Sequence, residues 1–149
     1  MKTYKVTKDN DGTIRWYNEE DQHHREDGPA IEWANGTKAW FINGELHRED
    51  GPAIERASGS KSWWLNGQLH REDGPAVEYA DGTKVWYLNG QYHREDGPAK
   101  EWADGSKSWW LNGQFLTEEE FNKRTQPHQE MTVAQLEQEL GYKIKIIKE

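Results

Sequence analysis

The sequence contains no cysteine, so disulfide bonds and thiolate metal sites are both excluded. It also has no apolar run long enough to span a bilayer. Its first residues lack the apolar core of a signal peptide. From these absences we expect a cytoplasmic protein that does not associate with membranes.

Positive charge is scarce as well, because 19 Lys and Arg stand against 27 Asp and Glu, for a net charge of −8. A chain with this balance does not attract the phosphate backbone of nucleic acids. It favours solubility and a basic partner. We therefore expect no direct binding to nucleic acid.

Apolar residues make up only 33% of the chain and charged residues 31%, which leaves little material for a thick core. The nine tryptophans offset this shortage, since each aromatic ring buries a large area from a single position. This composition fits a thin single sheet better than a packed globule.

The chain is organised around one heptapeptide, His-Arg-Glu-Asp-Gly-Pro-Ala. It occurs at residues 24–30, 47–53, 70–76 and 93–99, so successive copies begin 23 residues apart. A fixed period of this length is typical of a repeat array. We divide the chain into a degenerate N-terminal half-repeat (1–23), four β-hairpin repeats (24–114) and a C-terminal α/β cap (115–149).

Each repeat carries two turn signals. The first is Asn35-Gly36 and its equivalents Ser58-Gly59, Asp81-Gly82 and Asp104-Gly105; the second is Asn43-Gly44, Asn66-Gly67, Asn89-Gly90 and Asn112-Gly113. Dipeptides of this kind favour type I′ hairpin turns, which need positive φ at both central residues. We therefore predict a mainly β fold, an elongated single-sheet antiparallel β-meander, with a continuous strand over 37–42 in the first repeat.

An aromatic pair lies in the strand between the two turns of each repeat. Because neighbouring residues of a strand point to opposite faces, Trp40, Trp63, Trp86 and Trp109 share one face and Phe41, Trp64, Tyr87 and Trp110 the other. The returning strands add Trp33, Tyr79 and Trp102. A single sheet cannot readily bury both faces, so we expect one aromatic ladder to be exposed for binding, although the sequence leaves open which one.

The C-terminal region predicts two helices and a strand. Thr117 with Glu120, and Thr132 with Gln135, each form a capping-box pattern at a helix start. The first helix should end near Arg124, and Gly141 should end the second. Residues 142–148 alternate as a strand, at whose edge a second copy of the chain could pair to form a homodimer.

Residues 79–84 (Tyr-Ala-Asp-Gly-Thr-Lys) and 86–90 (Trp-Tyr-Leu-Asn-Gly) resemble a MORN-type repeat, and the resemblance covers roughly residues 11–114. It implies β-hairpin units. Members of the broader family join membranes, scaffold partners or act as bacterial antitoxins, and the heptapeptide is similar to repeats of phages, giant viruses and bacteria. The chain departs from the family pattern at this heptapeptide, where a glycine-rich stretch is usual, and it lacks the basic character linked to lipid binding.

The repeated polar residues do not indicate catalysis. Equivalent histidines such as His47 and His70 lie roughly 9–10 Å apart in such an array, too far to share a zinc ion. We expect each heptapeptide arginine to pair with acidic residues of adjacent repeats. The glutamates Glu32, Glu55, Glu78 and Glu101 recur in every repeat, whereas acid–base catalysis needs one distinct pair in a cleft. We therefore expect no enzyme activity, no metal and no cofactor.

The leading interpretation is a protein-binding repeat module, an inhibitor or antitoxin-like partner of a bacterial host protein, of phage or bacterial origin. The candidate contact residues are Phe41, Trp64, Tyr87, Trp110, Trp33, Tyr79, Trp102, Glu32, Glu55, Glu78 and Glu101. One alternative is a small-ligand or glycan binder that uses the aromatic ladder. A second alternative is an acidic mimic of DNA.

Overall fold

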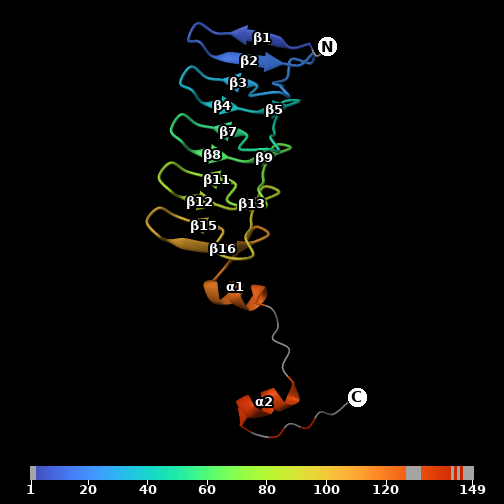
Figure 1. Ribbon diagram of the computed structural model, residues 1–149, viewed down its shortest axis with the longest axis vertical. Helices are drawn as coiled ribbons and strands as arrows, with labels where there is room; N and C mark the ends of the chain where they lie inside the picture. Colours follow the sequence, from blue (N-terminus) through green and yellow to red (C-terminus); the bar gives the residue numbers. More distant parts are fainter. Residues whose placement is uncertain (1–2, 127–131, 142, 144, 146–149) are drawn as a thin grey trace.

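The protein is an elongated β-meander, seen here in a computed structural model that describes residues 3–126, 132–141, 143 and 145. Eleven antiparallel strands follow one another along the long axis, three two-stranded hairpins lie beside them, and two short helices follow the last strand (Figure 1). This confirms the predicted fold class, a hairpin-repeat sheet with a small helical C-terminal region.

The main sheet gains two short strands from each repeat. Its strands, in order, are β1 (Lys5–Lys8), β2 (Ile14–Tyr17), β3 (Ile31–Glu32), β4 (Lys38–Ala39), β7 (Ile54–Glu55), β8 (Lys61–Ser62), β11 (Val77–Glu78), β12 (Lys84–Val85), β15 (Lys100–Glu101), β16 (Lys107–Leu111) and β17 (Gln114–Leu116). The hairpins are β5 (Phe41–Ile42) with β6 (Glu45–Leu46), β9 (Trp64–Leu65) with β10 (Gln68–Leu69), and β13 (Tyr87–Leu88) with β14 (Gln91–Tyr92). The heptapeptide carries the chain from each hairpin back to the sheet.

The predicted continuous strand over 37–42 is wrong, because the chain changes its pairing partner at the tryptophan. Trp40 N–H donates to the Ala53 carbonyl at 2.8 Å, in the next heptapeptide, while the Trp40 carbonyl accepts from His47 N–H at 3.1 Å. Residues before Trp40 therefore pair within the main sheet, and residues after it pair within the hairpin. Trp63 and Trp86 repeat this arrangement, whereas β16 runs without interruption through Trp109.

The two sets of turns also differ, although both were predicted to be type I′. At the hairpin tips both residues have positive φ, as in Asn43 (49°) and Gly44 (81°), which confirms the prediction for that set. In the other set only the glycine does, as at Gly36 (87°). There Gly36 N–H donates to the Trp33 carbonyl and Trp33 N–H to the Thr37 carbonyl, both at 2.9 Å, which fits a longer hairpin loop with a glycine bulge.

The core is thin and is built on the last residue of the heptapeptide. Ala30, Ala53, Ala76 and Ala99 are fully buried. Their carbonyls accept the tryptophan N–H groups described above, so the backbones of neighbouring segments lie close together. Alanine fits this position because it fills little space and costs almost no side-chain entropy on burial.

Helix α1 (Glu118–Thr125) closes the C-terminal end of the array. Leu116 and Thr117 stand where a fifth repeat would have His and Arg, 23 residues after His93 and Arg94. Thr117 forms the predicted capping box with Glu120, and Leu116 and Phe121 are buried where α1 packs on β16 and β17. The prediction of this helix is confirmed to within one residue.

Helix α2 (Val133–Leu140) begins with the predicted Thr132 capping box and ends at Gly141 in the left-handed conformation. In Figure 1 it stands beyond α1, apart from the sheet. Most of the strand predicted over 142–148 lies outside the described residues, and the homodimer expected from it stays a prediction. Neither of the two helices is long and apolar enough to cross a membrane, within the part of the chain that the structure describes.

Candidate binding surface

Strand register separates the candidate residues onto two faces of the main sheet. On one face, which we call the charged face, glutamates and lysines alternate from strand to strand: Glu32, Lys38, Glu55, Lys61, Glu78, Lys84, Glu101 and Lys107. Their strand neighbours Ile31, Ile54, Val77 and Lys100 point to the opposite face. The four candidate glutamates therefore lie on the charged face, away from the aromatic candidates.

The row of eight charged residues on this face carries no net charge, because four lysines balance four glutamates. Each glutamate also accepts a hydrogen bond from an arginine, as in Arg71 Nη1 to Glu78 Oε1 at 3.0 Å. A stripe of alternating sign does not reproduce the single sign of a phosphate backbone. The geometry therefore favours a structural role for these glutamates over DNA mimicry.

The heptapeptide arginines cover Trp40, Trp63 and Trp86 of the first tryptophan ladder, whereas Thr117 stands where an arginine would cover Trp109. The guanidinium of Arg71 stacks on the Trp63 ring at 4.0 Å and donates to Asp73 (2.8 Å) and to the Pro75 carbonyl (3.2 Å) as well as to Glu78. Arg25, Arg48 and Arg94 make the same contacts on Trp16, Trp40 and Trp86. The expectation that these arginines pair with acidic residues of adjacent repeats is wrong, because their acidic partners lie in the same repeat. The hydrogen bond from Arg71 holds the pKa of Asp73 below its usual value.

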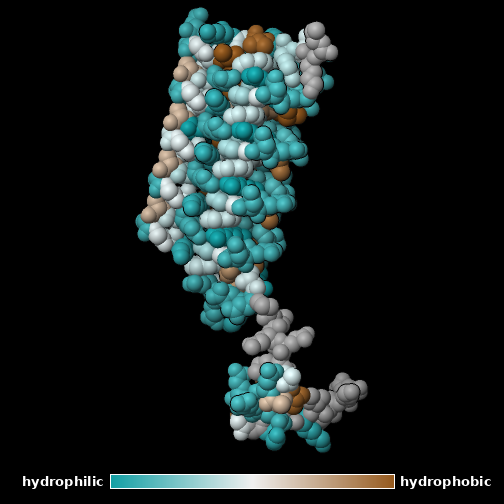
Figure 2. Space-filling model, in the orientation of Figure 1, coloured by the Kyte–Doolittle hydropathy of each residue, from teal (hydrophilic) through white to brown (hydrophobic). Residues whose placement is uncertain are grey.

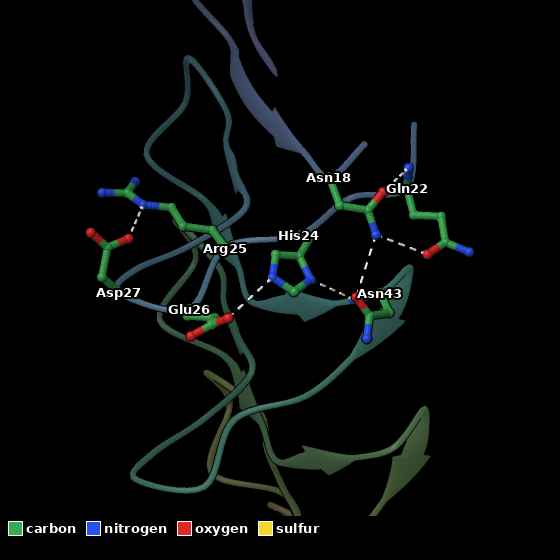
Figure 3. Close-up of polar contacts among 7 residues, drawn as sticks. All are labelled: Asn18, Gln22, His24, Arg25, Glu26, Asp27 and Asn43. Atoms are coloured by element: carbon green, nitrogen blue, oxygen red, sulfur yellow. Dashed lines mark hydrogen bonds and ion pairs between the residues drawn. The ribbon is translucent and has the colours of Figure 1, made fainter. Parts of the chain in front are cut away.

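The heptapeptide histidine joins each hairpin tip to the segment before it. Figure 3 shows the first case, in which His24 Nδ1 accepts from the Asn43 backbone N–H at 3.0 Å and Nε2 lies 3.7 Å from Glu26. His47, His70 and His93 accept from Asn66, Asn89 and Asn112 at 3.0–3.2 Å. Each histidine thus satisfies one backbone donor of the hairpin turn. No group of three His, Cys, Asp or Glu side chains among the described residues could hold a metal ion.

By strand alternation the opposite face, which we call the aromatic face, carries Phe41, Trp64, Tyr87 and Trp110 of the hairpins and Trp33, Tyr79 and Trp102 of the turn loops. Two hollows on this face show the arrangement: Trp64 and Tyr79 line one with Val77, and Tyr79, Tyr87 and Trp102 line the next with Val85. Tyr79 is 51% exposed and Trp102 41%. Phe41, Trp64, Tyr87 and Trp110 are half-buried, so the most exposed of the predicted rings on this face are those of Tyr79 and Trp102.

The hairpins add aromatic residues that the sequence reasoning missed. Tyr92 lies 4.5 Å from Tyr87 and 5.0 Å from Trp110, whose ring is 5.4 Å from Phe115. Phe115 is 58% exposed at the C-terminal end of this row. Tyr92 and Phe115 stand where earlier repeats have Leu46 and Leu69, so comparison of the repeats position by position could have found them.

A polar cluster lies within the aromatic face at the third and fourth repeats. The pKa of Tyr92 is lowered, first by a hydrogen bond from the Tyr87 hydroxyl and then by Lys100. The pKa of Tyr87 is raised, mainly because the hydroxyl is buried and also because it donates to Tyr92. The two phenols therefore interact with each other, and Tyr92 also interacts with Lys100.

Exposed negative charge is concentrated in the heptapeptide loops rather than on the charged face. The side chains of Glu49 and Glu72 are 86% exposed and that of Asp73 is 85% exposed, against 38% for Glu78. These loops recur about every 10 Å along the array. On the side drawn in Figure 2, hydrophilic side chains dominate over the repeats and hydrophobic ones form only small patches.

The chain matches no protein-family model and no curated protein. The resemblance of its repeats to MORN-type units therefore stays a prediction from the motifs.

Proposed function

We propose that the protein is a non-catalytic protein-binding repeat module whose contact surface is the aromatic face. The observation that supports this most directly is the exposure of large rings along that face, with Tyr79, Trp102 and Phe115 all more than 40% exposed. Exposed aromatic residues in a contiguous patch are typical of the centre of protein interfaces.

The charge of the molecule indicates what kind of protein would bind. The net charge is −8, and the most exposed carboxylates lie in the loops that repeat along the array. A basic partner would be attracted to such a surface and would associate faster at low salt. The heptapeptide also resembles repeats of phage and bacterial proteins. The acidic surface and this resemblance together lead us to propose an inhibitor of a basic bacterial protein.

The test is affinity capture from a bacterial lysate with the wild-type protein and with the double variant Tyr79→Ser, Trp102→Ser. Both rings lie at the surface, about half exposed, so their loss should leave the fold intact, and it should abolish capture because two central aromatic contacts disappear. A matched control, Lys61→Ser with Lys84→Ser, changes two exposed residues of the charged face and should capture normally.

Three results would contradict the proposal. They are the absence of any stoichiometric partner, a partner retained equally by the aromatic variant, and a partner lost only with the charged-face control. Circular dichroism of each variant establishes that a loss of capture is not a loss of folding.

A further inference from the structure

One position on the aromatic face departs from the repeat pattern. The first residue of the strand that follows the heptapeptide is Ile31, Ile54 and Val77 in the first three repeats, and Lys100 in the fourth. The register places Lys100 opposite Val85 and Ser108, so its side chain emerges on the aromatic face. A charged residue has thus replaced an aliphatic one at a position that packs against rings.

The ammonium group of Lys100 lies among three of these rings. Its Nζ is 3.7 Å from the centroid of Tyr92, 5.4 Å from that of Trp110 and 5.9 Å from that of Trp102. These cation–π contacts partly compensate for the hydration that the ammonium group loses. No ion pair joins Lys100 to any carboxylate of the described residues, whereas the heptapeptide arginines have two carboxylates each.

Lys100 also lines an open hollow of about 310 Å³. Rings of Tyr79, Tyr87, Tyr92 and Trp102 form its walls, and Asp81 and Thr83 stand at its edge. The Asp81 carboxylate already accepts the Thr83 backbone N–H at 2.8 Å. The hollow therefore offers one cation without a carboxylate partner, beside flat apolar surfaces.

We propose that this hollow binds a small ligand in which a carboxylate is attached to a six-membered ring. The carboxylate would pair with Lys100 Nζ through a charge-assisted hydrogen bond. The ring of the ligand would stack on the exposed faces of Trp102 and Tyr79. Two kinds of ligand have this chemistry, an aromatic acid and an acidic sugar, since both present a carboxylate on a ring that can lie against an indole.

The site does not depend on the proposed protein partner, and its test uses no partner. Ligand-observed NMR titrations would compare benzoate and galacturonate with their uncharged counterparts, benzyl alcohol and galactose. The decisive variant is Lys100→Ile, which restores the residue of the first two repeats and should therefore fold. The matched control is Lys107→Ile, which removes one lysine from the charged face of the neighbouring strand.

The wild type and Lys107→Ile should bind one or both acids at millimolar concentration, and Lys100→Ile should bind them about tenfold or more weakly. The uncharged counterparts should bind more weakly than the acids to the wild type. Binding of benzoate alone would assign an aromatic acid, and binding of galacturonate alone an acidic sugar. The proposal is overturned if neither acid binds, if Lys100→Ile binds as well as the wild type, or if the uncharged compounds bind equally well.

Discussion

The single residue that connects most of the array is the heptapeptide arginine. Its guanidinium is planar, so it can stack on a tryptophan while its edge donates to two carboxylates and a carbonyl. In the third copy, Arg71 does this with a side chain that is 21% exposed. Such a partly buried group contributes more than a surface ion pair, because its ring contact and its carbonyl bond are shielded from water.

Replacement of Arg71 by methionine should therefore lower the free energy of unfolding by about 1–3 kcal/mol. The variant loses the stack on Trp63 and leaves the Pro75 carbonyl and Glu78 without this donor. Arg56→Met is the control, since Arg56 is exposed and removing it changes the charge equally. Urea denaturation would measure both, and equal stability of the two variants would contradict the role assigned to Arg71.

Two histidines should respond oppositely to replacement by phenylalanine. His70→Phe removes the acceptor of the Asn89 N–H and should cost about 1–3 kcal/mol. The Nδ1 atom of His23 is buried with no hydrogen-bond partner among the described residues, and its ring stacks 4.7 Å from Tyr17. His23→Phe should therefore leave stability unchanged or raise it. Thermal melts of the two variants would show the contrast, and a large loss in His23→Phe would refute it.

His23 should also make stability depend on pH. Burial, followed by the positive charge of Arg15, lowers the pKa of His23 below its ordinary value of 6.5. As the pH falls below about 6.5 the unfolded chain binds the proton first, so the free energy of unfolding decreases until the folded pKa is passed. His23→Phe should lose less stability than the wild type between pH 7.5 and 5.5. Urea titrations at these two pH values would test this. An equal loss of stability in the wild type and in His23→Phe would contradict it.

At the scale of the elements, the C-terminal end of the array depends on α1. Phe121 is 4% exposed where α1 packs on the last strands, whereas Leu136 of α2 is 36% exposed. Phe121→Ala should cost about 3–5 kcal/mol, because it leaves a cavity beneath the helix. Leu136→Ala should cost little. Chemical denaturation followed by circular dichroism would compare the two, and a similar cost for both would place α2 in the folded core.

The sequence predicted the elements best where local chemistry determines them. The capping residues of both helices, the Asn-Gly hairpin tips and the repeat period each act over a few residues. The break at Trp40 was not predictable in this way, because it arises from a bond between Trp40 and Ala53 in the next heptapeptide. The sequence patterns also cannot distinguish a type I′ turn from a bulged loop at Asp81-Gly82, where only the glycine has positive φ.

The candidate site was predicted in part. Alternation separated the aromatic residues into two ladders, but only the three-dimensional contact between Arg48 and Trp40 shows which ladder is covered. The same alternation sets Glu78 and its neighbour Tyr79 on opposite faces, whereas only strand pairing shows that Trp64 lies on the face of Tyr79. Lys100 was visible in the sequence as a break among Ile31, Ile54 and Val77, yet its significance depends on the rings that folding brings around it.

At the scale of the whole molecule, stability should be a sum over repeats, because each repeat packs only on its neighbours. Deletion of residues 47–69 joins Leu46 to His70. This is the same Leu-His junction that Leu69 and His70 form in the intact chain. The shortened protein should fold, with lower stability and with a denaturant m-value reduced roughly in proportion to the surface that is lost.

Deletion of residues 47–68 is the matched control, since it leaves one extra residue at the junction. That residue should shift the register and turn the following side chains to the wrong face. The control should therefore lose cooperative unfolding, whereas the in-register deletion should keep it, as followed by circular dichroism in urea. If both deletions unfolded alike, the repeats would not be interchangeable, and specific contacts between particular repeats, such as Tyr92 with Trp110, would have to hold the array together.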